Sequence, residues 1–148
     1  NKKKINLTIA RPTLVYGPGD THNGYGPNKF IREVNNKKGI FLFGEGEEKR
    51  DHILINDLAF IISEFIDKKI YGIYTLATGE VISFYDIAKI IYNLKGLPLS
   101  NINFIKRKSP MPHNGYRAFD VSKIKSIIRN FNLTDIEEGI KKSINSLF

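Results

Sequence analysis

Short apolar segments alternate along the chain with longer segments of helical periodicity. The strand-like segments are apolar, rich in β-branched and aromatic residues, and bounded by Gly, Pro or Asn. This pattern predicts extended backbone for each of them. The predicted strands cover residues 5–10, 40–43, 50–55, 73–77 and 102–106.

The helical segments have apolar residues three and four positions apart, and each follows a residue that can cap a helix. The predicted helices cover residues 29–36, 58–67, 84–94, 121–131 and 135–147. We expect the caps to be, in chain order, Asn28, Asn56 or Asp57, Ser83 with Asp86, Asp120, and Thr134 with Glu137.

This alternation of strands and helices predicts an α/β fold, or α+β for the chain in isolation. A length of 148 residues is that of a single domain, so we treat 1–148 as one unit. Strands 5–10 and 73–77 stand alone in the sequence. We expect them to pair with segments far away in the chain or with sequence outside it.

Composition excludes several classes of protein. Apolar residues make up 41% of the chain, which is enough for a packed core. The absence of cysteine rules out a disulfide scaffold, a zinc–cysteine site and a thiol nucleophile. The sequence holds neither an apolar run of membrane-spanning length nor the apolar core of a signal peptide, so we expect a cytoplasmic location and no membrane partner.

The net charge of +8 has two interpretations. It can mark an anionic partner such as phosphate groups or nucleic acid. It can also reflect a composition rich in Lys, Asn and Ile, because the lysines are scattered apart from Lys2 to Lys4. The scatter of the lysines favours the second interpretation, that the charge reflects composition. A basic nucleic-acid-binding module, or a module that binds a protein partner through bare strand edges, remains an alternative function.

Known cofactor and catalytic motifs are sparse. The Gly- and Pro-rich segment 17–27 predicts a surface loop suited to function, yet no GxGxxG follows a strand and no GxxxxGK[ST] occurs. The three histidines are solitary and lack a metal-binding spacing. Two Tyr–Lys pairs stand four residues apart, at Tyr25 and at Tyr85, as often as chance would place them. We therefore predict no catalytic residue and no metal site.

Arginines and aromatic residues give the remaining candidates. Arg50 opens a predicted strand, where a guanidinium can grip phosphate or form a surface pair with Asp51 or a nearby Glu. Phe41 and Phe43 can stack on a nucleobase or belong to the core, and the pattern favours the core. Arg107 and Arg117 bracket a loop, where they can reach an anion or remain solvated.

Six segments in order resemble the C-terminal part of the NAD-dependent epimerase/dehydratase family, the extended short-chain dehydrogenases that act on nucleotide sugars. They are RPTLVYGPGD, NKFI, IFLFGEGEEKRDHILINDLA, YTLATGEVISFYDIA, FDVSKI and TDIEEGI. The resemblance covers almost the whole chain. It implies the substrate-binding part of an extended Rossmann-type dehydrogenase, used in carbohydrate biosynthesis.

The resemblance also implies roles for individual positions. Arg50 matches the arginine that contacts the diphosphate of the nucleotide sugar, and Arg117 is the nearest candidate for a second arginine of that clamp. Asn28 matches the start of a helix that presents backbone amides to the phosphates.

Two further segments acquire roles in the same way. The strand segment from Phe41 through Phe43 to Gly44 matches the one that lies against the base. Tyr16 matches the end of a strand that abuts the sugar site. Leu14 stands where many relatives have asparagine.

The family's Gly-rich cofactor loop and its catalytic Tyr-x-x-x-Lys belong to a segment that would precede residue 1. The complete enzyme is therefore expected to use NAD or NADP, whereas this chain alone is expected to bind neither and to catalyse nothing. Its expected partners are a nucleotide-sugar substrate and an N-terminal half or a second copy, with no nucleic acid. Strands 5–10 and 73–77 would complete the sheet of that half and would otherwise be exposed edges.

Overall fold

The computed structural model describes residues 5–129 and 131–146. The helices are α1 (Pro27–Asn35), α2 (Ile55–Asp67), α3 (Phe84–Leu94), α4 (Ser122–Ile127) and α5 (Ile136–Ser146), with 3-10 turns η1 (Leu99–Asn101) and η2 (Pro112–Gly115). The strands are β1 (Thr8–Pro12), β2 (Leu14–Tyr16), β3 (Ile40–Phe43), β4 (Lys49–Arg50), β5 (His52–Leu54), β6 (Gly72–Leu76), β7 (Ile82–Ser83), β8 (Ile102–Ile105) and β9 (Tyr116–Arg117). None of the helices in these described ranges is long and apolar enough to cross a membrane.

The strands pair mainly in parallel. β1 pairs with β6, β2 with β5, and β3 with β8, each as a parallel two-stranded sheet. A fourth sheet has three strands, with β4 at its centre, antiparallel to β7 and parallel to β9. Parallel pairs joined through helices make this an α/β chain, as the alternation of elements predicts.

The two strands that seem isolated in the sequence pair with each other. The register runs from Thr8 beside Gly72 to Pro12 beside Leu76. The strand predicted at 5–10 therefore begins and ends later than the apolar pattern suggests, because its bounds follow the partner strand. A proline is tolerated in β1 because, among the described residues, this strand pairs with β6 alone and is an edge strand.

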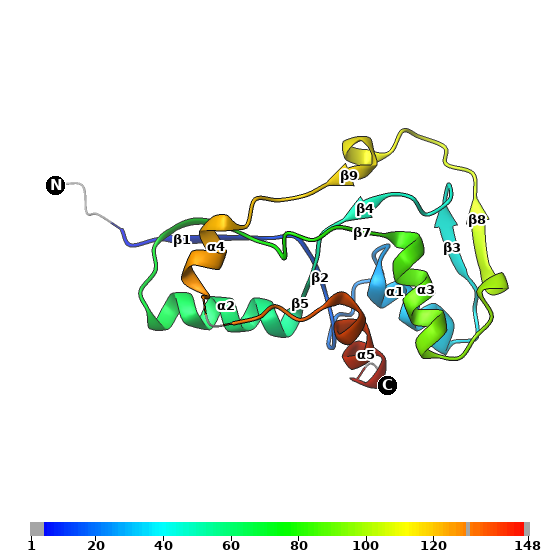
Figure 1. The fold of residues 1–148 in the computed structure, drawn as a ribbon, viewed down its shortest axis with the longest axis horizontal. Coiled ribbons are helices and arrows are strands. Elements are labelled where there is room, and N and C mark those ends of the chain that lie inside the picture. The colour runs from blue at the N-terminus through cyan, green and yellow to red at the C-terminus, as the bar shows by residue number, and fades with distance from the viewer. Residues whose placement is uncertain (1–4, 130, 147–148) are drawn as a thin grey trace.

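Two clusters of buried apolar side chains hold these elements together (Figure 1). One lies among α1, α3, α5, β3 and β8, where Phe30, Leu42 and Ile91 are fully buried. The other lies among α2, α4 and β6, where Ile61 and Leu76 are fully buried. Figure 1 shows α2 beside β1 at one end of the molecule and α1, α3 and β3 at the other.

The cap predicted for α3 is confirmed, and the cap predicted for α1 is wrong. Ser83 Oγ accepts the backbone N–H of Asp86 at 3.0 Å and donates to its carboxylate at 2.5 Å. Helix α1 instead starts after Gly26 with Pro27 in its first turn, a residue whose fixed φ suits a helix start. Asn28 lies inside the helix, and its side chain bonds to a neighbouring loop.

The caps predicted for α2 and α5 are also wrong. Helix α2 follows β5 directly, and Leu54 occupies its N-cap position. Asp57 accepts the backbone N–H of Thr134 at 2.7 Å and its hydroxyl at 2.9 Å, so these two residues bond to each other across 77 positions of sequence. At the start of α5, Asp135 accepts the N–H of Glu137 at 2.8 Å.

The C-terminal helices also differ in length from their predictions. The cap predicted at Asp120 is wrong, because Val121 occupies the N-cap position of α4. Asp120 accepts the N–H of Ser122 at 2.8 Å just before the helix. Helix α4 then ends at Ile127 rather than at 131. Ile124 and the C-cap residue Ile128 pack in the second cluster. The predicted last position of α5, residue 147, lies outside the described residues.

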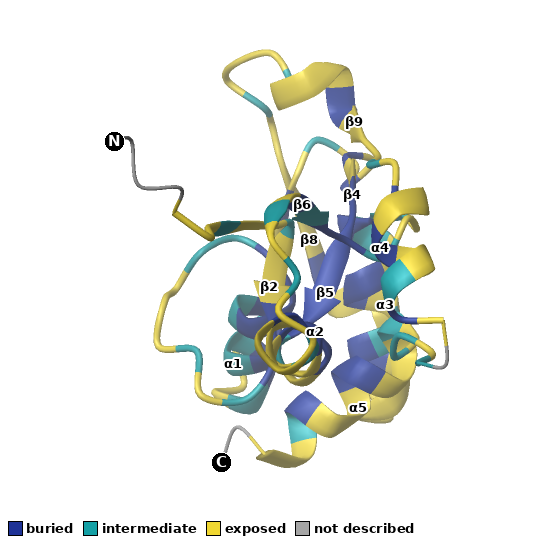
Figure 2. Ribbon diagram, turned by 90° about the vertical axis from the view of Figure 1, so that its left-hand side faces the viewer, coloured by how far each residue is buried: buried dark blue, intermediate teal, exposed yellow. Residues whose placement is uncertain are grey.

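An apolar face remains exposed on the β1–β6 pair and on neighbouring elements (Figure 2). Ile9 and Ile73 are register partners on one face of this pair, and they are 38% and 49% exposed. In β2, Leu14 and Val15 are similarly exposed. Parallel sheets are usually covered on both faces, so this surface is unusual for a folded chain.

Candidate functional site

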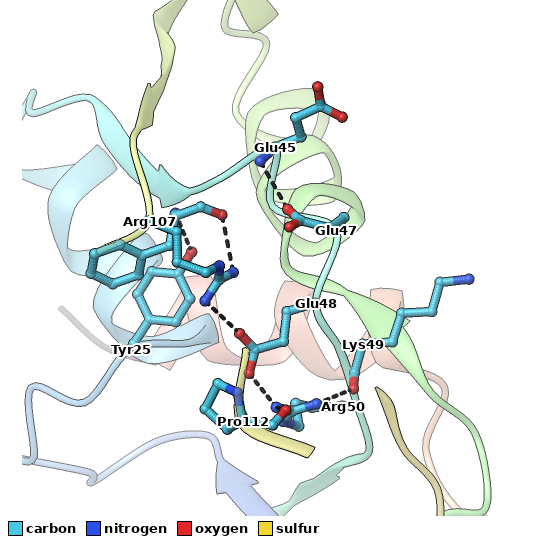
Figure 3. A network of polar contacts seen from close by, with 9 residues as sticks. Tyr25, Glu45, Glu47, Glu48, Lys49, Arg50, Arg107 and Pro112 are labelled. Carbon is cyan, nitrogen blue, oxygen red and sulfur yellow. Dashed lines mark hydrogen bonds and ion pairs between the residues drawn. The ribbon is translucent and has the colours of Figure 1, made fainter. Parts of the chain in front are cut away.

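Arg50 is buried at the centre of the three-stranded sheet. Only 7% of the residue is exposed. Its Nη2 contacts the Glu48 carboxylate and donates to the carbonyl of Pro112 at 2.7 Å, while Nη1 donates to the carbonyl of Lys49 at 2.8 Å (Figure 3). The predicted pairing of Arg50 with a nearby Glu is therefore confirmed, but its predicted surface location is wrong, because both residues are buried.

Arg107, which follows β8, reaches the same carboxylate from the other side. Its Nη1 donates to Glu48 Oε2 at 3.1 Å and its Nη2 to the carbonyl of Phe43 at 3.3 Å (Figure 3). Glu48 thus bridges two guanidinium groups, one on each carboxylate oxygen. We call Arg50, Glu48 and Arg107 the arginine–glutamate bridge.

Arg117 lies next to this bridge. It is the register partner of Arg50 in the β4–β9 pair. The two arginines contact neighbouring residues of η2, since Arg50 bonds to Pro112 and Arg117 Nη1 lies 2.6 Å from Nε2 of His113. The structure therefore brings the two arginines of the predicted clamp side by side, with Arg50 buried and Arg117 exposed.

Phe41 and Phe43 lie on the outer face of β3. They are 50% and 40% exposed, whereas Ile40 and Leu42 between them are fully buried. The core interpretation of these phenylalanines is therefore wrong, because β3 is buried on one face only. Gly44 follows with φ of 61°, a left-handed backbone conformation that favours glycine in the turn after β3.

Tyr16 and Asn28 line a separate cavity of about 290 Å³ at the end of β2. The Asn28 amide accepts the N–H of Gly17 at 3.1 Å and donates to the Gly17 carbonyl at 3.0 Å and to Asp20 at 2.8 Å. Burial raises the pKa of Asp20, but hydrogen bonds from Asn28 and from the His22 N–H, with the charge of Arg32, hold it below its ordinary value. Asn28 thus fixes the loop at the start of α1.

Tyr25 connects this cavity to the arginine–glutamate bridge. It lines the cavity, its hydroxyl accepts the Phe43 N–H at 3.2 Å, and its ring lies 5.2 Å from that of Phe43. Burial raises the pKa of Tyr25 to about 12. Lys29, four residues later, pairs with Glu33 at 3.7 Å. Tyr25 is therefore placed as a neutral packing residue, not as half of a Tyr–Lys pair.

His52 is the buried histidine of the region. Its Nδ1 lies 3.2 Å from the carbonyl of Arg50, which assigns the proton to Nδ1. Burial lowers the pKa of His52 to about 4, against the help of that hydrogen bond, and the charge of Arg50 lowers it further. The ring is neutral at pH 7. Within the described residues, no three His, Asp or Glu side chains come close enough to hold a metal ion.

Glu48, Tyr25 and His52 were missed as site residues from the sequence. Glu48 and Arg50 are two positions apart in an extended segment, so their side chains point to the same face. This spacing of two residues is a signal in the sequence that pairs Glu48 with Arg50. The contacts of Tyr25 with β3 and of Arg107 with Glu48 join distant segments, for which the sequence carries no local signal.

The chain belongs to the NAD dependent epimerase/dehydratase family, whose sequence profile matches residues 1–77. It is 28% identical over 144 residues to a UDP-glucuronate 4-epimerase of Thermodesulfobacterium geofontis, covering 95% of the chain and 43% of that protein. It is 30% identical over 115 residues to a dTDP-L-rhamnose 4-epimerase of Burkholderia thailandensis, covering 74% of the chain and 32% of that protein. The chain therefore spans less than half the length of these curated relatives.

Solved structures share the fold. A UDP-N-acetylglucosamine 4-epimerase from Methanobrevibacter ruminantium, in complex with UDP-N-acetylmuramic acid, superposes with a TM-score of 0.82 at 18% identity, over 95% of this chain and 46% of that one. A UDP-glucuronic acid 4-epimerase from Bacillus cereus, in complex with UDP-glucuronic acid and NAD, gives 0.80 at 21% identity, over 96% and 45%. The chain thus has the fold of part of an extended short-chain dehydrogenase.

The loop between β2 and α1 lacks the GxGxxG spacing. It is also closed on itself by the bonds from Asn28 to Gly17 and Asp20. This loop therefore does not carry the glycine fingerprint of a Rossmann dinucleotide site.

Proposed function

We propose that this chain is the C-terminal, nucleotide-sugar-binding portion of an NAD(P)-dependent nucleotide-sugar epimerase or dehydratase. The observation that carries the proposal is that Arg50 and Arg107 meet at Glu48, with Arg107 6.0 Å from the centre of the exposed Phe43 ring and Arg117 on the strand beside Arg50. Guanidinium groups grip phosphates bidentately, and exposed aromatic rings give a base a surface on which to lie. The names of the relatives, which are UDP- and dTDP-sugar enzymes, point to the same ligand class.

Each part of the ligand has a place in this proposal. Arg50 and Arg117 hold the diphosphate, and Phe41 and Phe43 lie against the base. The sugar extends toward the cavity lined by Tyr16, at the carboxyl end of β2, where ligands of α/β proteins commonly bind. Hydride transfer belongs to the NAD-binding portion of a longer enzyme, since catalysis needs cofactor and substrate held together.

Replacing Arg50 is the direct test of the ligand site. We expect Arg50→Ala to weaken binding of UDP- and dTDP-sugars by about 1.5–3 kcal/mol, the contribution of a hydrogen bond to a charged group. Isothermal titration calorimetry measures this loss. Arg129→Ala, which removes an exposed arginine far along the chain, is the matched control and should bind as the parent does. Equal affinity in Arg50→Ala and the parent would remove the proposed role.

The exposed apolar face is the second part of the proposal. We propose that the face around Ile9 and Ile73 packs against the NAD-binding portion, so that in isolation it is open to self-association. We expect the isolated chain to associate as its concentration rises. Ile73→Lys should abolish this association and change stability by no more than about 0.5 kcal/mol, as for other surface substitutions.

Sedimentation velocity measures the association. Phe104→Lys is the control, because Phe104 is 54% exposed but lies on β8, at the other end of the molecule from β1 (Figure 1). The Phe104→Lys variant should associate as the parent chain does. A parent chain that stays monomeric at every concentration would contradict the proposed interface.

A further inference from the structure

The arginine–glutamate bridge has the geometry of an occupied anion site. Glu48 offers one carboxylate oxygen to Arg50 and the other to Arg107, and Glu48 and Arg50 are 8% and 7% exposed. A bound phosphate group offers separate oxygens to two guanidinium groups in the same manner. The position between the two arginines is therefore already filled by a group of the chain itself (Figure 3).

The positive charge around this position exceeds the charge of one carboxylate, which favours an anion of higher charge. One carboxylate faces two guanidinium groups, and a third, that of Arg117, lies on the neighbouring strand. The Nε of Arg107 is buried and has no hydrogen-bond partner among the described residues. Since a buried donor without an acceptor is costly, an additional oxygen at this place would be favourable.

The main chain around this position is held in place by hydrogen bonds. The backbone carbonyl of Glu48 accepts the N–H of Phe84 at 3.1 Å, and the strand β4 that follows is hydrogen-bonded on both sides. The main chain is thus fixed, and the carboxylate alone has to rotate away. A diphosphate carries more charge and more acceptor oxygens than one carboxylate, so it can replace it at both arginines.

We propose that the Glu48 carboxylate occupies, in the ligand-free chain, the place between Arg50 and Arg107 that the diphosphate of the ligand takes. Glu48 is then an internal competitor that sets the affinity of this place for the diphosphate. This inference rests on the proposed function, because it takes a nucleoside diphosphate as the ligand of Arg50.

The test compares Glu48→Gln with the parent chain, using UDP and inorganic pyrophosphate as probes in calorimetric titrations. The substitution keeps the shape of the side chain and removes the competing charge. We expect both probes to bind about tenfold more tightly to Glu48→Gln, as the removal of one nearby like charge predicts. Glu45→Gln is the matched control. It removes the same charge from an exposed position on the preceding turn and should bind as the parent does.

Weaker binding to Glu48→Gln would show that Glu48 holds the arginines in place for the ligand, and it would overturn the competition. Unchanged binding would also overturn it. If the parent binds and Arg50→Ala does not, these two results leave the proposed function intact. If neither the parent nor Glu48→Gln binds UDP, both the inference and the proposed function fail.

A measurement on the unaltered sequence covers the case in which Glu48→Gln does not fold. We expect pyrophosphate to shift the NMR signal of the Arg107 Nε–H in the parent chain, because that donor gains an acceptor. The signal is assigned with Arg107→Lys, which lacks it. An Arg107 signal that stays in place while pyrophosphate binds would overturn the inference.

Discussion

Asp51→Ala is expected to lower the free energy of unfolding by about 3 kcal/mol or more. Asp51 is fully buried. Its Oδ1 accepts the N–H of Thr78 at 3.0 Å and its Oδ2 accepts the N–H of Gly79 at 2.8 Å. The substitution removes two hydrogen bonds to a charged acceptor and leaves two donors at the turn after β6 without their partner.

The position of Asp51 explains why the loss should be global. Asp51 lies between β4 and β5, and the turn that it holds follows β6 of the second cluster. The carboxylate therefore joins the β4–β5 segment to the turn after β6. Urea denaturation followed by circular dichroism measures the effect. Asp51→Asn keeps one acceptor and should lose about half as much. Stability unchanged in Asp51→Ala would contradict the role of this residue.

The elements that the sequence predicts well are those whose signals are local. The strand at 40–43 has its predicted bounds, and the Ser83–Asp86 cap starts α3 as expected. In both places, the residues that carry the sequence signal are neighbours in the chain. The buried stripe of α1, with Phe30, Ile31 and Val34, likewise follows from helical spacing alone.

The contacts that the sequence cannot predict join distant segments. Asp57 looks like a helix cap beside α2, yet it bonds to Thr134, which looks like a cap itself. Each residue satisfies a hydrogen-bonding need of the other, so neither is available to its own helix. The pairing of β1 with β6 is of the same kind, because its register depends on residues more than 60 positions apart.

The candidate site follows the same division. Side chains two positions apart in an extended segment lie on one face, so the sequence itself indicates that Glu48 and Arg50 share a face. That this face is buried, and that Arg107 closes it from β8, depends on the packing of three separate segments. The exposure of Phe41 and Phe43 is equally a tertiary property, since an alternating strand of four apolar residues does not say how many of its faces are covered.

His52 should make the stability of the chain sensitive to mild acid. Its folded-state pKa is lowered to about 4 by burial, whereas the unfolded histidine has its ordinary value of about 6.5. Between these values, the unfolded state binds a proton that the folded state excludes. The stabilisation is therefore complete above pH 6.5 and is lost progressively as the pH falls to about 4. The total loss is about 3 kcal/mol.

His52→Phe isolates this contribution. A phenyl ring retains the edge-to-face contacts with Tyr16 and Phe84, whose ring centroids lie 6.4 and 5.7 Å from that of His52. Carboxylates titrate in both proteins, so the difference between their unfolding free energies from pH 7.5 to 4.5 belongs to His52. We expect the parent to lose more stability than the variant over this range. Parallel curves of unfolding free energy against pH would contradict this prediction. They would mean that the imidazole accepts its proton in the folded chain, and hence that the cavity it lines with Tyr16 is open to water.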